Sequence, residues 1–376
     1  MSGLYLHIPF CRSRCIYCGF YSTTALELRQ QYVDALCHEM LMRPPAGPVK
    51  TVYLGGGTPS QLSARQLRQL FIYINKVYGH DAEEVTIEVN PDDVTADYAA
   101  LLQQLPVNRV SMGVQTFDNG RLRFLHRRHT AGQVAGAVGL LREAGIHNIS
   151  IDLMYGFPDE TLGDWQRDIR QALELNVEHL SAYCLMIEEG TALYERMKGE
   201  EVRGEREKGG LTPCDEELER QMYELLTDEL EKAGYEHYEI SNFARPGYRS
   251  RHNTSYWCEV PYIGLGAGAH SFDLRSRQWN VSNIRQYIES IADGKLPCER
   301  EVIDEDTRYN DRITVALRTR EGLDLDTLTD RHRRYCLKEA QRYIDNGLLR
   351  LHGSHLMLTR EGLFVSDMVM SELVWV

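Results

Sequence analysis

The sequence predicts an α/β protein built on a parallel sheet and followed by a smaller helical domain. Six short strand-like runs alternate with helical segments through the first half of the chain. Parallel strands need crossover helices, so this alternation indicates neighbouring parallel strands. The chain has 376 residues, more than the roughly 250–300 at which a single core stops growing. From about Asp304 the pattern changes to helical stretches and one hairpin signal, at Gly353-Ser354.

The strands and helices are placed by their spacing and their ends. Helix 64–77 carries Leu67, Leu70, Phe71 and Ile74 at helical intervals, and Pro106 ends helix 95–105. The predicted strands are 4–8, 49–54, 84–89, 109–114, 149–154 and 179–186, and the helices between them are 26–42, 64–77, 95–105, 131–144 and 162–175. Either an open doubly wound sheet or a barrel fits this pattern.

The second half of the chain is less periodic. Residues 199–215 are charged and Gly-rich, which predicts a mobile surface loop, and Asp215 is placed to cap the helix after it. The further predictions are helix 216–233, strand 235–243, a small-residue segment 262–271, helix 283–293, a hairpin at 348–358 and a helix at 361–375. The hairpin beside helices predicts a winged-helix-like domain.

Net charge, apolar runs and cysteine content limit the partners and the cellular location that we expect for the chain. Lys and Arg number 42 against 55 Asp and Glu, so the net charge is −13. An acidic chain is a poor non-specific binder of nucleic acid, so we expect no nucleic-acid partner despite the winged-helix pattern. No apolar run approaches the roughly 20 residues of a membrane span, and we find no signal peptide, so a cytoplasmic location is expected. The nine cysteines fit a reducing compartment better than a disulfide framework.

Three cysteines form the most informative motif. Cys11, Cys15 and Cys18 have the spacing C-x-x-x-C-x-x-C, directly after the first strand. Soft thiolates suit iron–sulfur clusters, which usually take four cysteines. Three thiolates leave one iron free for a ligand that is not protein. The alternative is a zinc site, which would need a fourth ligand such as His7.

Further polar residues follow the ends of other strands. They are Gly55–Thr58, Glu88, Gln115 and Asp152. In barrels and in open α/β sheets, ligands bind at the carboxyl edge of the parallel strands. We therefore expect these residues and the cysteines to converge on one site.

The cysteine motif and the Gly-Gly-Gly-Thr-Pro run at 55–59 resemble the signature of radical S-adenosylmethionine (radical SAM) proteins. The resemblance implies a partial (βα)6 barrel that binds a [4Fe–4S] cluster. It also implies that the open iron binds the amino and carboxylate groups of SAM, whose reductive cleavage gives a 5′-deoxyadenosyl radical. Glycines at 55–57 would let the backbone approach the methionyl end of SAM, because they lack a Cβ.

Nearly the whole chain resembles the oxygen-independent coproporphyrinogen III oxidase (HemN-like) group. The resemblance implies that nine residues contact SAM, some of them a second SAM. Taken singly, each has another interpretation: Asp152 as a solvated strand end, for example, or Glu88 as a capped turn. The nine positions are Tyr5, Tyr17, Gly56, Gly57, Thr58, Glu88, Gln115, Arg127 and Asp152.

Two features depart from the oxidases. Phe20 stands where they usually carry a fourth cysteine, and the longer N-terminal arm is missing. Both point to the sister branch of HemW-like haem chaperones, which residues 252–257 (HNTSYW) also resemble through their H-N-x-x-Y-W motif. The resemblance implies that His252 ligates haem iron and that Tyr256 and Trp257 stack on the macrocycle. The alternative is a polar turn with Trp257 as a core anchor.

The predicted function is therefore that of a haem chaperone that delivers haem to apo-haemoproteins, and its alternative is oxidative decarboxylation of coproporphyrinogen III. Whether the protein is an enzyme stays open, as do its oligomeric state and a membrane-surface association. An active protein would need an electron donor such as flavodoxin or ferredoxin. His270 is a second haem-ligand candidate, although a buried structural histidine is the preferred interpretation. The predicted domains are 1–235 (barrel), 236–300 (extension with the motif) and 301–376 (helical).

Overall fold

The computed structural model describes residues 2–202 and 213–376. Part of the loop predicted at 199–215 therefore lies outside the described residues. Its first residues belong instead to a helix, α7 (Ala192–Val202). Asp215 does precede the next helix, α8 (Glu216–Lys232), as its N-cap residue, but its side chain makes no capping hydrogen bond to any residue that the structure describes.

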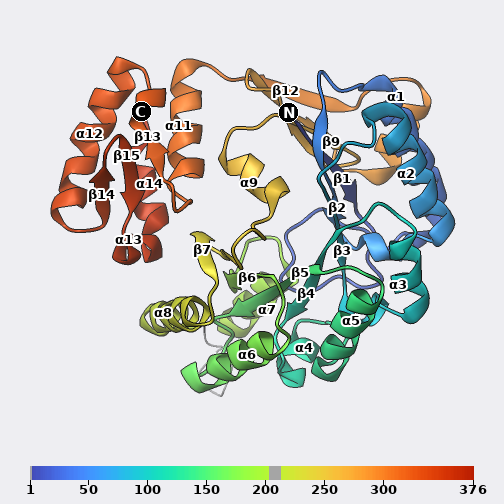
Figure 1. Cartoon of the computed structure of the whole chain (residues 1–376), viewed down its shortest axis with the longest axis horizontal. Helices are drawn as coiled ribbons and strands as arrows, with labels where there is room; N and C mark the ends of the chain where they lie inside the picture. Colours follow the sequence, from blue (N-terminus) through green and yellow to red (C-terminus); the bar gives the residue numbers. More distant parts are fainter. Residues whose placement is uncertain (1, 203–212) are drawn as a thin grey trace.

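Six parallel strands form the centre of the molecule, in the order in which they occur in the chain. They are β1 (Ser2–Ile8), β2 (Val49–Gly56), β3 (Glu84–Val89), β4 (Arg109–Gln115), β5 (Asn148–Tyr155) and β6 (His179–Cys184). The helices among and after them are α1 (Arg29–Met42), α2 (Ala64–Tyr78), α3 (Ala96–Gln103), α4 (Asn119–Phe124), α5 (Ala131–Glu143), α6 (Leu162–Glu174) and α8 (Glu216–Lys232). These helices cover the outer side of the curved sheet (Figure 1).

The sheet extends beyond the six parallel strands at both edges to a total of 12 strands. Next to β1 lie β9 (Tyr262–Leu265), β10 (His270–Phe272), β11 (Ser276–Asn280) and β12 (Cys298–Val302), and next to β6 lie β8 (Asn242–Ala244) and β7 (Glu236–Glu239). Within the described residues the edge strands β12 and β7 do not pair, so the sheet does not close. The predicted partial barrel is confirmed.

Side chains alternate between the two faces of the parallel strands. On the outer face, apolar residues such as Ile87, Val110 and Ile151 pack into the main hydrophobic core. The residues between them are polar and occupy the inner face: Glu84, Thr86, Glu88, Arg109, Ser111, Ser150, Asp152, His179 and Ser181. Fully covered parallel sheets usually have apolar residues on both faces, so a polar inner face indicates a sheet that encloses a polar site.

The C-terminal domain has its own hydrophobic core, which includes Tyr309, Ile313, Leu356 and Leu373. Its elements are α11 (Glu305–Ala316), β13 (Leu323–Asp324), α12 (Asp330–Asp345), β14 (Leu349–His352), β15 (His355–Leu358), α13 (Arg360–Phe364) and α14 (Ser366–Leu373). The β14–β15 hairpin turns at Gly353-Ser354, as the sequence predicts. The helical domain with a wing-like hairpin is confirmed, whereas the predicted domain boundaries remain a prediction.

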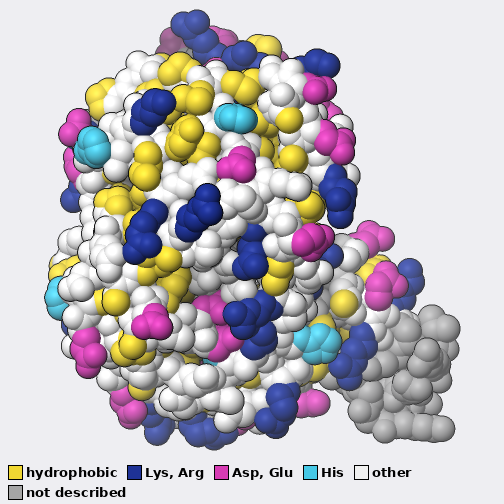
Figure 2. Space-filling model, turned by 90° about the vertical axis from the view of Figure 1, so that its right-hand side faces the viewer, with side chains coloured by type: hydrophobic (Ala, Val, Ile, Leu, Met, Phe, Trp, Pro, Cys, Tyr) yellow, Lys and Arg dark blue, Asp and Glu magenta, His cyan; other side chains and the backbone are white. Residues whose placement is uncertain are grey.

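The helix α9 (Arg251–Trp257) contacts both β2 of the sheet and α11 of this domain, whereas α10 (Ile284–Ala292) packs on α1 in the main core. Figure 1 shows α9 between the sheet and the C-terminal domain. Charged side chains of both signs are distributed over the face in Figure 2. Among the described residues, none of the helices combines the length and the apolar character that crossing a bilayer requires.

Candidate cofactor site at the carboxyl edge of the parallel strands

The three cysteines lie on the loop that follows β1, and all three are partly exposed. The loop is held near its start by a hydrogen bond from the backbone N–H of Cys11 to the carbonyl of Thr23 (2.9 Å). Burial raises the pKa of the Cys11 and Cys18 thiols, and the neighbouring cysteines raise it further. The three sulfurs therefore lie within electrostatic range of one another, as ligands of one cluster must.

The donor set fits a cluster better than a single metal ion. In the described ranges, no three His, Cys, Asp or Glu side chains are arranged to hold one metal ion. Both ring nitrogens of His7 are engaged, Nδ1 with the Tyr5 hydroxyl and Nε2 with the Tyr21 carbonyl, each at 2.9 Å. His7 therefore does not complete a zinc site. A cluster takes its thiolates on separate irons, so its cysteine ligands surround one cluster but stand farther apart than the ligands of a single ion.

The glycine run after β2 is required by packing. A Cβ on Gly56 would lie 2.3 Å from the His7 ring, and one on Gly57 would lie 2.7 Å from the backbone of Ile8 and Pro9. Gly56 also has a φ of +104°, which favours glycine. The run thus lets the end of β2 lie directly against the end of β1, next to the cysteine loop. The backbone N–H of Thr58 donates to the carbonyl of Phe10 (2.9 Å), and the Thr58 hydroxyl lies 3.6 Å from the Cys11 sulfur.

Glu88 is the acidic group of this edge. Its carboxylate accepts a hydrogen bond from the Tyr53 hydroxyl (2.8 Å) and another from the backbone N–H of Gly56 (3.0 Å). Burial raises the pKa of Glu88 to about 7, although the bond from Tyr53 lowers it and Asp152 raises it further. A positively charged group placed beside Glu88 would lower this pKa and keep the carboxylate ionised at neutral pH.

Arg127 joins the cysteine loop to two strands. Its guanidinium donates to the Cys15 sulfur (3.7 Å), the Asn90 side-chain oxygen (2.5 Å) and the Gly113 carbonyl (2.5 Å). A Cβ on Gly113 would lie 2.9 Å from the amide of Gln115 and 3.1 Å from Arg127, so both side chains lie above this glycine. Gln115 itself has a φ of +69° at the end of β4.

Asp152 belongs to the same group of residues. Gly113 is its register partner on β4, and the Ser111 hydroxyl donates to it at 3.4 Å. Burial raises the pKa of Asp152 to about 6, against the opposing effect of Arg109. Burial also raises the pKa of Tyr17, which lies in electrostatic range of Arg127 and Asp152. The structure therefore brings the predicted residues of five segments to one edge, and their contacts with SAM remain a prediction.

Sequence reasoning does not identify two residues of the inner face, Arg109 and Tyr53. Arg109 is 1% exposed, and its Nε and Nη1 atoms have no hydrogen-bond partner within residues 2–202 and 213–376. Tyr53 holds Glu88. The signal was the alternation within strands: polar residues at 109 and 111 alternate with Val110 and Met112, which indicates a polar inner face.

The segment 252–257 forms α9 and lies next to this group of residues, because the His252 ring stacks on the ring of Tyr53 with 5.1 Å between their centroids. His252 is 1% exposed, and both of its ring nitrogens are engaged, with the Thr51 hydroxyl (2.8 Å) and the Tyr256 hydroxyl (2.8 Å). Burial lowers the pKa of His252 to about 3. Iron ligation through one ring nitrogen of His252 would require the hydrogen bond at that nitrogen to break, and the other bond could remain. Trp257 is partly exposed, and its ring lies 5.1 Å from the Arg318 guanidinium.

Two other predictions concern exposed side chains. Phe20 is 72% exposed beside the cysteine loop, where its ring does not contribute to the core. His270 is exposed on β10 and stacks on Trp279 with 6.1 Å between ring centroids. The interpretation of His270 as a buried structural histidine is therefore wrong, because β10 lies in the antiparallel extension of the sheet and presents this side chain to solvent.

Comparison with known proteins agrees with this arrangement. Residues 5–172 match the family model of the Radical SAM superfamily, and residues 303–365 match that of the HemN C-terminal domain. The chain is 35% identical to the heme chaperone HemW of Bacillus subtilis over 98% of both chains. It is 34% identical to the heme chaperone HemW of Mycobacterium tuberculosis over 99% of this chain and 94% of the relative.

A solved structure shares the fold. The coproporphyrinogen III oxidase HemN from Escherichia coli superposes with a TM-score of 0.83 over 99% of this chain and 90% of that chain, at 22% sequence identity. At this identity the similarity concerns the fold alone. It covers both the sheet and the C-terminal domain.

Proposed function

The chain belongs to the family of heme chaperone HemW proteins within the radical SAM superfamily, and we propose that it binds haem and passes it to apo-haemoproteins. The observation that carries this proposal is the 35% identity to a heme chaperone over 98% of both chains. The absence of a cysteine at Phe20, where the oxidases usually carry one, also supports it. We further propose that the protein acts in the cytoplasm.

The proposed resident cofactors are a [4Fe–4S] cluster and SAM. Cys11, Cys15 and Cys18 would hold the cluster, and each thiol must lose its proton to do so. When bound, the cluster supplies one-electron reduction, for which flavodoxin or ferredoxin would be the donor. Arg127, which donates to the Cys15 sulfur, would stabilise the thiolate charge and fix the orientation of the loop.

The SAM contacts are proposed on the residues that converge at the carboxyl edge. Glu88 would accept the amino group of SAM, since an ammonium beside a carboxyl lowers its pKa and keeps it ionised at neutral pH. Two hydrogen bonds already fix its orientation. The other proposed contacts are Tyr5, Tyr17, Gly56, Gly57, Thr58, Gln115, Arg127 and Asp152.

The segment of His252, Tyr256 and Trp257 is proposed to contribute to haem binding. Tyr256 and Trp257 are partly exposed, whereas the buried His252 holds α9 against Thr51 of β2. A haem titration of His252→Ala tests ligation directly. A changed absorbance spectrum of the bound haem supports ligation by His252. An unchanged spectrum and affinity restrict the contribution of this segment to Trp257 and its neighbours.

The test of the function itself uses the reconstituted protein under anaerobic conditions. With SAM, a reductant and coproporphyrinogen III, a chaperone leaves the porphyrinogen unchanged, and it binds haem in a separate titration. Decarboxylated product over multiple turnovers would establish the oxidase alternative instead. A chain that neither binds haem nor turns over the porphyrinogen would refute both functions.

A further inference from the structure

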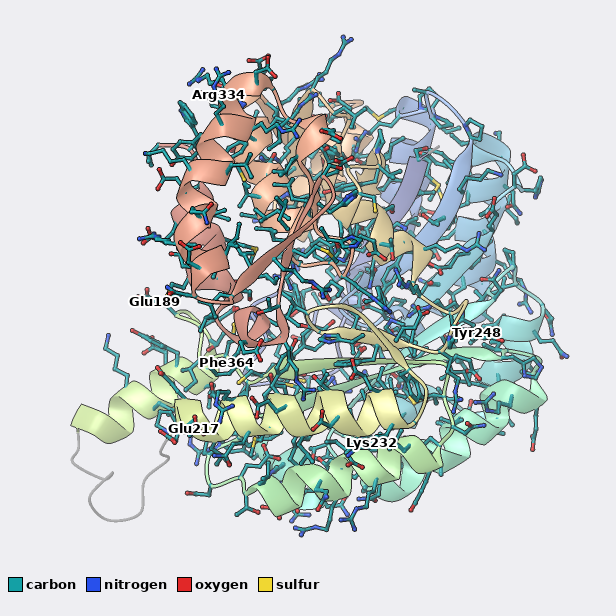
Figure 3. All side chains as sticks on the ribbon, turned by 60° about the vertical axis from the view of Figure 1, so that its left-hand side comes forward. Glu189, Glu217, Lys232, Tyr248, Arg334 and Phe364 are labelled. Carbon is teal, nitrogen blue, oxygen red and sulfur yellow. The ribbon has the colours of Figure 1, made fainter. Side chains whose placement is uncertain are left out.

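A large groove lies between the sheet and the C-terminal domain, away from the cysteine loop. Its volume is about 890 Å³, within the range of roughly 300–1,000 Å³ that is usual for ligand sites. One side is formed by α8 and β7, and the other by β14, β15 and α13. Figure 3 shows α13, with Phe364, facing α8 between the labelled residues Glu217 and Lys232.

The two sides of the groove are fixed to each other at separate points. The backbone N–H of Ile240 donates to the carbonyl of Arg318 (3.1 Å), and that of Arg320 donates to the carbonyl of Tyr238 (3.0 Å). Arg318 also pairs with Glu239 at 2.8 Å. On the α8 side, Arg360 pairs with Asp228 at 2.6 Å. The groove is therefore preformed and needs no domain movement to exist.

One wall of the groove is apolar, and part of it is exposed. Phe364 is 37% exposed and Met368 is 48% exposed. The apolar lining of the C-terminal domain consists of Leu348, Leu358, Leu363, Phe364, Val365 and Met368. Exposed aromatic and thioether side chains in a concave site indicate an apolar ligand body. Met368 and His237 also carry atom types that haem iron accepts as ligands.

The cations of the lining fall into two groups. Three arginines form ion pairs within the protein: Arg220 with Glu224, Arg318 with Glu239, and Arg360 with Asp228. Arg320 and Arg350 are exposed, and within the described part of the chain their side chains have neither an ion pair nor a hydrogen bond.

The acids of the lining are mostly neutralised. Besides Glu224 and Glu239, Glu236 pairs with Arg249, and Glu231 lies in electrostatic range of Arg360. Only Glu361 of the lining acids has no cation assigned to it among the described residues. The site thus offers two unpaired guanidinium groups beside an apolar wall.

We propose that this groove is the haem site, with the macrocycle on the apolar wall and its two propionates on Arg320 and Arg350. Haem is a flat apolar body with two carboxylates, and guanidinium groups bind carboxylates in a planar, bidentate manner. The inference rests on the proposed function, since haem is the cargo assigned there. It places the cargo away from the cysteine loop, so that haem and the cluster occupy separate sites.

The groove also gives the segment at 252–257 a role. Trp257 stacks on Arg318, whose neighbours Thr319 and Arg320 line the groove. Thr319 also lines a smaller cavity of about 390 Å³, and Trp257 lies on its wall. Trp257 therefore supports the strip that presents Arg320 to the haem, and it acts on haem as a positioning residue.

The test is a haemin titration of the full chain, followed by absorbance. We expect Arg320→Gln/Arg350→Gln to bind haemin roughly tenfold or more weakly than wild type, because two charged hydrogen-bonding partners are lost. Wild type should prefer haemin to haemin dimethyl ester, and the double variant should not. Arg334→Gln removes an exposed arginine at the opposite end of the C-terminal domain (Figure 3) and should bind like wild type.

Equal haemin affinity of wild type and the double variant would overturn the proposal, and so would equal binding of haemin and its ester by wild type. Wild type that binds no haemin at all would refute the proposed function rather than the choice of groove. Phe364→Ala tests the apolar wall independently, because it removes the aromatic ring without adding a charge. It should weaken the binding of haemin and of the ester alike, and unchanged affinity for both would exclude the groove.

Discussion

Two segments carry the chemical motifs of the chain, and their side chains differ in exposure and in hydrogen bonding. One is the loop of Cys11, Cys15 and Cys18, and the other is the segment of His252 and Trp257. The cysteines are partly exposed at the carboxyl edge of the sheet, and these three form no disulfide with one another. His252 is buried and uses both ring nitrogens within the protein. The comparison teaches that partly exposed donor atoms at a strand edge stay accessible to a ligand, whereas buried donor atoms that are hydrogen-bonded within the protein stabilise the fold.

The largest effect expected from this comparison is the loss of the cluster. Cys15→Ser should abolish the brown absorbance and the bound iron after anaerobic reconstitution, since two thiolates do not hold a cubane. Cys258→Ser changes an exposed cysteine outside the motif and should reconstitute like wild type. Iron content and absorbance decide the matter. A retained cluster in Cys15→Ser would mean that the ligands are assigned wrongly.

The next effect concerns the packing of the strand edge. Gly56→Ala should destabilise the protein without cluster by about 3–4 kcal/mol, the sum of a positive φ and a forced shift of the His7 ring. Gly145 has a φ of +83° and open space around it, so Gly145→Ala should cost only about 1 kcal/mol. Urea denaturation measures both. Equal losses would show that the close approach of β2 to β1 contributes no stability.

His252→Ala tests the other side of the comparison. We expect a loss of about 3 kcal/mol in the free energy of unfolding, because two hydrogen bonds disappear from a buried site. His270→Ala changes an exposed histidine and should stay within about 0.5 kcal/mol of wild type. Thermal or urea denaturation separates the two variants. A stability of His252→Ala equal to that of wild type would refute its structural role.

The smallest effect expected is a pH dependence at the strand edge. The pKa of Glu88 is raised by burial from 4.5 to about 7, so its favourable contribution is complete below pH 4.5 and is lost as the pH rises through 7. Glu88→Gln should therefore gain about 2 kcal/mol relative to wild type between pH 5 and pH 8.

Denaturation of the protein without cluster at the two pH values measures this gain. Exposed Glu143→Gln should show no such pH-dependent difference from wild type. A constant difference between Glu88→Gln and wild type would contradict a raised pKa. In the same variant, the affinity for SAM should fall, so stability and cofactor binding should change in opposite directions.

Much of the parallel sheet was predictable because its signals are local. Strand 84–89 was predicted to the residue, and the helix predicted at 64–77 extends by one residue in α2. β12 was missed because four of its five residues, Glu299–Val302, are exposed and the segment lacks an apolar pattern. The strands β9 and β8 extend the sheet by pairing with β1 and β6, which lie far away in the sequence, and a local pattern does not reveal such pairs.

The candidate site was predictable where motif residues follow strand ends, as Cys11, Glu88 and Asp152 do. Arg109 was missed although the strand alternation contained the signal. The environment of His252 was not predictable, because its partners Thr51 and Tyr256 come from β2 and from one turn further along α9. The groove with Arg320 and Arg350 was not predictable either, since it exists only once two domains have docked.

The most direct measurement of the central claim is haem transfer. The reconstituted protein is loaded with haem, separated from free haem and mixed with an apo-haemoprotein, and the absorbance of the acceptor is followed. We predict that the acceptor gains haem faster from the loaded protein than from an equal amount of protein-free haem treated with a scavenger. Acceptor that stays apo while the loaded protein keeps its haem, or turnover of coproporphyrinogen III by the same preparation, would contradict the account.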